Sequence, residues 1–212
     1  MNVSSYSRTQ MSKVLGVFSV ALIVSLIGFF VGQFVPPAFF LPLHIAELFL
    51  VIVIVIMSQC SYMSYFFMYT FMFISGITVY AIIAEYIGTI GTPMVLRAFL
   101  LTVVTFSLAA IYAYSTKRDF SYLKNFLFMS LILLIGLGLI NVFSPFSGTT
   151  EMLVSGFGVF VFIGYTLFDF NRMAKEDISD ESIPLMVVSI YVDFINLFIH
   201  MLRLLAALIG EN

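Results

Sequence analysis

The chain has 212 residues, of which 62% are hydrophobic and 9% charged, with a net charge of −2 and a mean hydropathy of +1.13. A soluble domain carries roughly a quarter charged residues, so this composition excludes a soluble protein and predicts an all-α integral membrane protein. The sequence has no basic block, which argues against a nucleic-acid partner, and its one cysteine, Cys60, excludes an internal disulfide or a cysteine-ligated zinc site.

Seven stretches are apolar enough to cross a bilayer, for which a helix needs about 20 residues. In chain order, the expected spans are 14–33, 38–57, 62–84, 94–114, 123–143, 152–171 and 183–209, within a single domain of residues 1–212. Pro36 and Pro37 follow the first stretch in place of a small-residue cleavage site, which favours an uncleaved span. Gly88 and 91–93 are expected to break the chain between the third and fourth spans, and Pro184 suits a first helical turn.

The distribution of lysine and arginine predicts the orientation of the chain. On the side of the N-terminus lie Arg8, Lys13, Lys117, Arg118, Lys124, Arg172 and Lys175, whereas only Arg97 and Arg203 fall elsewhere. We therefore expect a cytoplasmic N-terminus and an external C-terminus. A re-entrant last segment would instead leave both ends in the cytoplasm.

Ionisable residues lie inside the spans, where they are costly and are functional candidates. Glu47 is in the middle of the second span. At about 100° per residue, Asp193, Asn196, His200 and Arg203 of the last span fall within an arc of about 80°. This polar stripe must pack against protein, so the last helix is expected to lie at the centre of the other six.

Asp169 lies near the end of the sixth span, and Asp193 lies near the start of the seventh. Antiparallel neighbours joined by a short loop would bring the two carboxyl groups to nearly the same level. Two carboxyl groups in contact at low dielectric cannot both ionise easily, so they would share a proton and titrate as a pair. Alternatively, each aspartate caps a helix or hydrogen-bonds a neighbour.

Other polar residues leave alternatives open. Glu47 and Arg203 are expected near mid-membrane, either as a buried ion pair or with a direct role in transport. His200 is either a hydrogen-bonded core residue or a ligand or relay.

The chain resembles the transmembrane Bax inhibitor motif family, and specifically its bacterial members. The matching pieces occur in order along nearly the whole chain: VGQFVP (31–36), SGITVY (75–80), NVFSP (141–145), YTLFDFNRM (165–173) and SIYVDFINLFIHMLRLL (189–205). The last piece is the most specific.

The resemblance implies seven helices around the C-terminal one, in a bacterial cell membrane, and a pH-sensitive calcium leak. It also implies that Asp169 and Asp193 form the pH sensor and that Glu47 and Arg203 are polar core positions. Calcium takes six to eight oxygen ligands in a tight site, so Asp169, Asp193 and Asn196 with water are expected to form only a weak calcium site. The bacterial relatives carry a basic cluster after the second helix, whose arginine latches onto the sixth-helix aspartate. This chain has no positive charge there; Ser58 or Gln59 are the possible replacements, and a neutral partner should hold less tightly.

The function expected from the sequence is a calcium leak channel whose partners are the lipid bilayer, calcium ions and protons, with no cofactor. A proton-coupled calcium antiporter would use the same paired carboxyl groups, and a regulatory protein that binds another membrane protein is a further alternative. An intramembrane aspartyl protease is disfavoured because its Gly-x-Gly-Asp and Pro-Ala-Leu motifs are missing. No other catalytic motif appears, so an enzyme is not expected.

Overall fold

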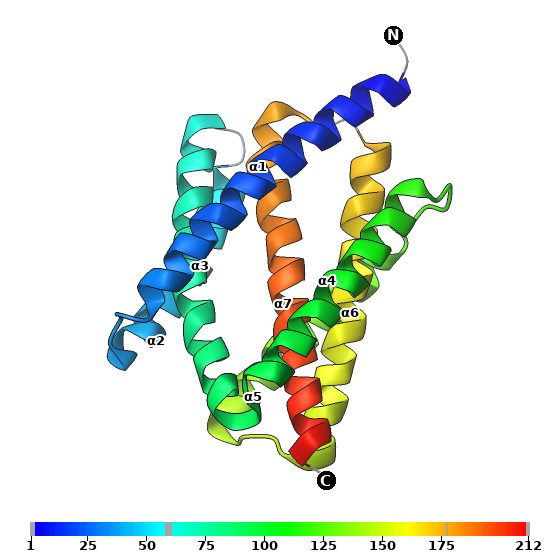
Figure 1. Ribbon diagram of the computed structural model, residues 1–212. Coiled ribbons are helices and arrows are strands. Elements are labelled where there is room, and N and C mark those ends of the chain that lie inside the picture. Colours follow the sequence, from blue (N-terminus) through cyan, green and yellow to red (C-terminus); the bar gives the residue numbers. More distant parts are fainter. Residues whose placement is uncertain (1–2, 58–60, 177, 211–212) are drawn as a thin grey trace. The chain divides into compact units, whose positions relative to one another are not determined.

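The structure is a computed structural model that describes residues 3–57, 61–176 and 178–210, and these residues are helical apart from short connections (Figure 1). In chain order the elements are α1 (Val3–Gly32), the 3-10 helix η1 (Pro37–Phe39), α2 (Phe40–Ile56), α3 (Ser61–Ile90), α4 (Thr92–Ser115), α5 (Leu123–Phe143), α6 (Gly148–Lys175), the 3-10 helix η2 (Asp180–Ser182) and α7 (Ile183–Gly210). Seven of the described helices are long and apolar enough to cross a membrane. The expected all-helical, seven-span architecture is confirmed.

The break between the third and fourth helices lies at one glycine. Gly91 has a φ of 80°, in the left-handed region that glycine adopts without steric cost, and Pro93 then occupies the first turn of α4. The prediction that Gly88 also breaks the chain is wrong, because α3 continues through it to Ile90. A single glycine weakens a helix but does not end it when the backbone can keep helical hydrogen bonds.

Several helices run further than their predicted spans, among them α3 and α6. α3 covers Ser61–Ile90, where 62–84 was expected, and α6 covers Gly148–Lys175, where 152–171 was expected. Hydropathy marks the apolar part of a helix, whereas the backbone hydrogen bonds continue past it. In α6 the polar ends also suit the helix dipole, with Glu151 in the first turn and Arg172 and Lys175 in the last.

The chain forms two compact units. Unit 1 comprises the described residues of 1–85 and 176–191, and unit 2 those of 86–175 and 192–212. α7 is continuous from Ile183 to Gly210 and contributes residues to both units. It is also the most buried of the seven spans, with 56% of its apolar window inside the protein. This burial agrees with the expected central role of the C-terminal helix.

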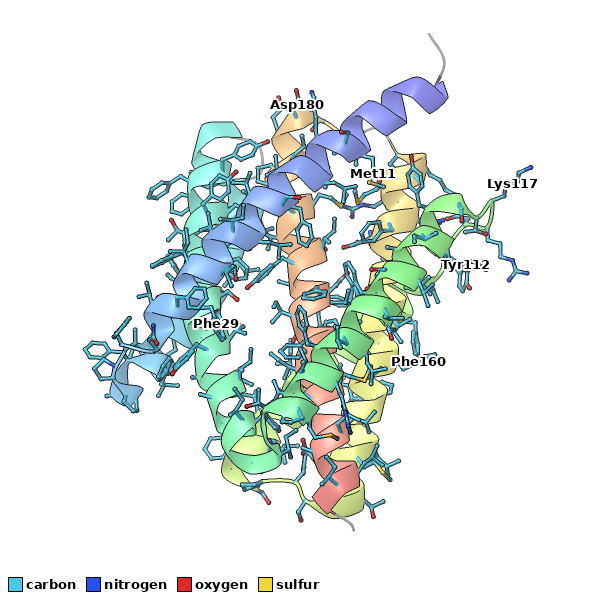
Figure 2. All side chains as sticks on the ribbon, viewed as in Figure 1. Met11, Phe29, Tyr112, Lys117, Phe160 and Asp180 are labelled. Atoms are coloured by element: carbon cyan, nitrogen blue, oxygen red, sulfur yellow. The ribbon has the colours of Figure 1, made fainter. Side chains whose placement is uncertain are left out.

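In unit 1, α1 and α3 pack with their backbones in contact. A Cβ atom on Gly28 of α1 would collide with the carbonyl oxygen of Phe73, and one on Gly76 of α3 would collide with that of Ser25. Such glycines are typical of close helix crossings in membranes. Phe29, labelled in Figure 2, continues this contact, with its ring edge-on to Tyr80 at 5.4 Å between centroids.

In unit 2, α6 packs against both α4 and α5. The buried face of α4 follows a helical period and consists of Val95, Ala98, Thr102, Phe106, Ala109 and Ala113. On the other side, Gly164 of α6 admits the side chain of Leu127, whose Cδ2 would lie 2.7 Å from a Cβ at the glycine. Small residues on α4 and α6 therefore permit close packing around α6.

The large side chains exposed on the helices are mainly apolar. α2 exposes Leu41, Leu48 and Ile56 to about 70% (69%, 69% and 72%), and Phe160 of α6, labelled in Figure 2, is 66% exposed. In water such surfaces would aggregate, whereas the acyl chains of a lipid bilayer solvate them. Together with the spans, this surface makes the protein an integral membrane protein.

Candidate proton and ion site

The two predicted sensor aspartates both lie in unit 2 and are both buried. Asp169 of α6 is 3% exposed and Asp193 of α7 is 4% exposed. The carboxyl groups are near enough to interact electrostatically, and the phenol of Tyr165, one turn before Asp169, interacts with both. The Oδ2 atom of Asp193 is buried and has no hydrogen-bond partner among the described residues. The structure thus brings together the two carboxyl groups that the sequence singled out.

The residues that follow these two aspartates in sequence pack against other aromatic rings. The ring of Phe106 on α4 lies edge-on to Phe170 at 5.7 Å and to Phe194 at 5.3 Å between centroids. Phe99 lies edge-on to Phe194 at 6.2 Å and to Phe198 at 5.8 Å. Phe170 and Phe194 directly follow the two aspartates in sequence, so aromatic packing lies one residue along each helix from the buried carboxyl groups. Low local polarity strengthens the interaction between charges there.

The remaining polar residues of α7 have separate environments. The Asn196 amide donates a hydrogen bond to the Val192 carbonyl oxygen at 2.8 Å. The His200 ring stacks on Phe162 at 5.7 Å between centroids and packs on the backbone of Gly158, and its buried Nδ1 has no hydrogen-bond partner among the described residues. His200 therefore packs as a core aromatic, and Arg203, one turn on, interacts with it electrostatically.

Glu47 lies in unit 1, and its carboxylate contacts residues of α2 and α3. His44 Nδ1 lies 3.0 Å from Oε2 of Glu47, and the Thr78 hydroxyl donates to Oε1 at 2.9 Å. Arg203 belongs to unit 2, so the expected Glu47–Arg203 pair stays a prediction. Ser58 and Gln59, the expected latch replacements, lie outside the described residues.

The carboxyl groups supply few ligands for a metal ion. Among residues 3–57, 61–176 and 178–210 no cluster of three or more His, Cys, Asp or Glu side chains occurs. Calcium takes six to eight oxygen ligands in a tight site. Asp169, Asp193 and Asn196 would bind calcium weakly, and this site stays a prediction.

Comparison with known proteins places this chain in a family. The family described as "Inhibitor of apoptosis-promoting Bax1" matches residues 7–209, nearly the full chain. The chain belongs to the Bax inhibitor-1 family. The family is non-enzymatic, and its members reside in membranes.

Relatives of this Bax inhibitor-1 family protein occur in eukaryotes, bacteria and viruses. It is 35% identical over 155 residues to Bax inhibitor 1 of Schizosaccharomyces pombe, covering 72% of this chain and 56% of that protein. It is 38% identical over 112 residues to a Golgi anti-apoptotic protein of vaccinia virus, covering 53% and 46%. An uncharacterised protein of Campylobacter jejuni is 26% identical over 197 residues, covering 89% and 84%. The chain thus spans about half the length of the first two relatives.

One polar residue of the family-like piece YTLFDFNRM has a structural role that the sequence did not reveal. Asn171 is 2% exposed. Its amide donates to the carbonyl oxygens of Ala113 at 3.0 Å and Arg118 at 3.1 Å and accepts from the backbone N–H of Phe120 at 3.1 Å. Lys175, one turn on, also donates to the Arg118 carbonyl oxygen. Asn171 therefore fixes the end of α4 and the α4–α5 loop of this Bax inhibitor-1 family protein to α6, two residues after Asp169.

A second cluster overlooked from the sequence lies in unit 1. The Tyr191 hydroxyl of α7 is 2.7 Å from the Ser25 hydroxyl of α1 and 3.2 Å from that of Ser75 on α3. Tyr191 is 1% exposed, and Phe71 lies edge-on to its ring at 6.1 Å. A buried phenol needs such partners, so the three hydroxyl groups tie α1, α3 and α7 together two residues before Asp193.

Proposed function

We propose that this protein is a pH-sensitive calcium leak channel in which Asp169 and Asp193 share a proton. The observation that carries the proposal is the burial of two carboxyl groups, one on α6 and one on α7, that interact electrostatically. Ionisable groups inside membrane spans are rare and mark candidate ion or proton sites. Membership of the Bax inhibitor-1 family and the resemblance to its bacterial leak proteins support the same function.

The proposed mechanism rests on the charge of the pair. With one proton, the two carboxyl groups carry a single negative charge and one can donate a hydrogen bond to the other. Loss of that proton leaves two charges in an apolar setting, and their repulsion favours a conformation that separates them or admits water and cations. Calcium would then meet two carboxylates and the Asn196 amide, too few ligands to trap it, which suits conduction.

Closure is expected to be weaker than in relatives that carry the arginine latch. Ser58 or Gln59 would hydrogen-bond Asp169 as neutral partners, without the ion pairing and bidentate geometry that an arginine supplies. We expect a higher resting leak for that reason.

Calcium flux into proteoliposomes, followed with a trapped calcium dye between about pH 6 and pH 8, tests the proposal. We expect Asp169→Asn and Asp193→Asn each to flatten the pH dependence, and the double variant to add little because the pair titrates as one unit. Asp119→Asn is the matched control, since the Asp119 side chain is 70% exposed, and it should keep the parental profile. Unchanged pH profiles in both single variants would contradict the proposal.

The same liposomes separate a leak from a proton-coupled antiporter. A leak passes calcium down its own gradient when no proton gradient exists, whereas an antiporter needs the counter-ion. We expect uptake driven by calcium alone. Uptake that appears only with an opposing proton gradient would identify an antiporter instead.

A further inference from the structure

Unit 1 contains a chain of hydrogen bonds that begins at an exposed histidine and ends in the protein interior. His44 Nδ1 lies 3.0 Å from Glu47 Oε2, and the Thr78 hydroxyl lies 2.9 Å from Glu47 Oε1. The same hydroxyl lies 3.0 Å from the carbonyl oxygen of Ser75. The His44 side chain is 46% exposed, whereas that of Glu47 is 14% exposed. The carboxylate is thus shielded, with an imidazole between it and the surroundings.

Thr78 has one proton for two acceptors. A hydroxyl group carries a single O–H donor and can also accept. When Glu47 is ionised, the Thr78 proton points to Oε1. When Glu47 carries a proton on Oε1, that proton can be donated to the Thr78 oxygen, and the Thr78 proton turns to the Ser75 carbonyl oxygen. Neither protonation state leaves a donor of this group without an acceptor.

The His44 ring completes the same pattern on the other carboxylate oxygen. A neutral ring with its proton on Nδ1 donates to Oε2, and so does a protonated ring, whose extra proton is on Nε2. If the added proton is on Oε2, the ring takes the other tautomer and Nδ1 accepts. One proton taken up from outside can therefore reside on either residue without loss of a hydrogen bond.

We propose that His44, Glu47 and Thr78 form a proton-binding site in unit 1, in which one proton is shared between the imidazole and the carboxylate. The site lies on α2 and α3, whereas Asp169 and Asp193 lie on α6 and α7, and it does not depend on calcium conduction. It extends the proposed function by adding a second place where the protein binds a proton.

Uncharged groups of α3 and α7 also interact with the site. α3 contributes Thr78 and Ser75, and α7 contributes the Tyr191 phenol, which interacts electrostatically with Glu47. The Tyr191 hydroxyl is bonded to the hydroxyl groups of Ser25 and Ser75. A protonated imidazole would offset the charge of the carboxylate at this site.

Nuclear magnetic resonance of the imidazole nitrogens tests the site, because the chain has only two histidines. In His200→Gln protein labelled with nitrogen-15 histidine and held in lipid nanodiscs, the remaining ring is that of His44. We expect its neutral form to carry the proton on Nδ1, bonded to Glu47. Glu47→Leu removes the acceptor, and the ring should then show the mixed tautomers of a free imidazole.

Threonine variants on α3 provide a matched pair. Thr78→Val keeps the shape but removes the hydroxyl that donates to Glu47 Oε1, and it should shift the nitrogen-15 resonances of the His44 ring. Thr70→Val is the control, because the Thr70 hydroxyl donates to the carbonyl oxygen of Phe66 one turn back, and it should leave these resonances unchanged. If the His200→Gln protein does not fold, the parental protein serves, with His44→Gln assigning its two rings.

An imidazole with the same tautomer in Glu47→Leu as in the parent would overturn the proposal, as would equal effects of Thr78→Val and Thr70→Val. Because these measurements record the His44 ring and not calcium flux, they succeed or fail independently of the leak mechanism.

Discussion

In unit 2, a single buried polar side chain connects the α4–α5 loop to α6. Asn171 satisfies three backbone groups at once from inside the protein, one in the last turn of α4 and two in the α4–α5 loop. The loop also contains hydrogen bonds of its own. The hydroxyl and the backbone N–H of Ser121 donate to Asp119 and hold the pKa of that exposed carboxyl below its usual range. The resulting contribution to stability is complete above the ordinary carboxyl pKa and is lost as the pH falls through the lowered value.

Replacement of Asn171 by alanine should destabilise the protein. It leaves buried backbone groups unpaired, each at a cost of about 1–3 kcal/mol, and a loss of about 2 kcal/mol lowers the unfolding temperature by roughly 4–8 °C at this size. Thermal unfolding in detergent measures the change. Asn125→Ala, at an exposed position of α5, is the matched control and should stay within about 0.5 kcal/mol. Equal stabilities of the two variants would show that the clamp contributes nothing.

The sequence predicts functional ionisable residues in the spans better than hydroxyl residues with distant partners. Asp169 and Asp193 stand out in any apolar span, because ionisable groups there need a reason. Ser25, Ser75 and Thr78 do not, because a hydroxyl can bond the carbonyl one turn back in any membrane helix, and only the fold selects another partner. The contact between Glu47 and His44 could have been predicted, because His44 lies three residues before Glu47, within reach on one helix face.

At the scale of helices, glycine positions decide which faces can meet. Gly28 and Gly76 have the backbone of the opposite helix within contact distance, whereas Gly88, on the same helix as Gly76, has no atom within 4 Å of an added Cβ. The sequence predicted a breaker at Gly88 because glycine is a weak helix former. It could not show that Gly76 is a packing position, since that depends on which face of α3 meets α1.

Gly76→Ala should therefore weaken the α1–α3 contact, and Gly88→Ala should not. The added methyl group at Gly76 would lie 2.8 Å from the Ser25 carbonyl carbon and 2.9 Å from the Phe29 nitrogen, both backbone atoms that cannot move aside. Overpacking of this kind costs about 1–3 kcal/mol, whereas alanine at Gly88 should be neutral or stabilising by up to about 1 kcal/mol. Unfolding of both variants in detergent gives the comparison, and a more stable Gly76→Ala protein would refute the packing argument.

For the whole molecule, the seven spans follow from hydropathy alone, and the family follows from short motifs spread along the chain. The orientation in the membrane rests on the lysine and arginine distribution. Lys117 extends away from the helices at the end of α4 (Figure 2) and Arg118 is exposed beside it. These charges lie on the loop that Asn171 and Lys175 hold against α6.

Labelling with a membrane-impermeant maleimide tests the expected orientation. In a Cys60→Ser background, cysteines placed at the exposed positions Ser121 and Ser147 mark the two ends of α5. We expect Ser147→Cys to react in intact bacterial cells and Ser121→Cys to react only after the cells are opened. The reverse pattern would place the N-terminus outside.

The single proton of Thr78 also sets an order of events in time. A hydroxyl rotates in picoseconds to nanoseconds, whereas packed helices move in microseconds to milliseconds. If the proposed site holds, the Thr78 hydroxyl proton will turn many times between Glu47 Oε1 and the Ser75 carbonyl oxygen before α2 or α3 can shift. The helices would then respond to the average protonation of the site rather than to the arrival of any one proton.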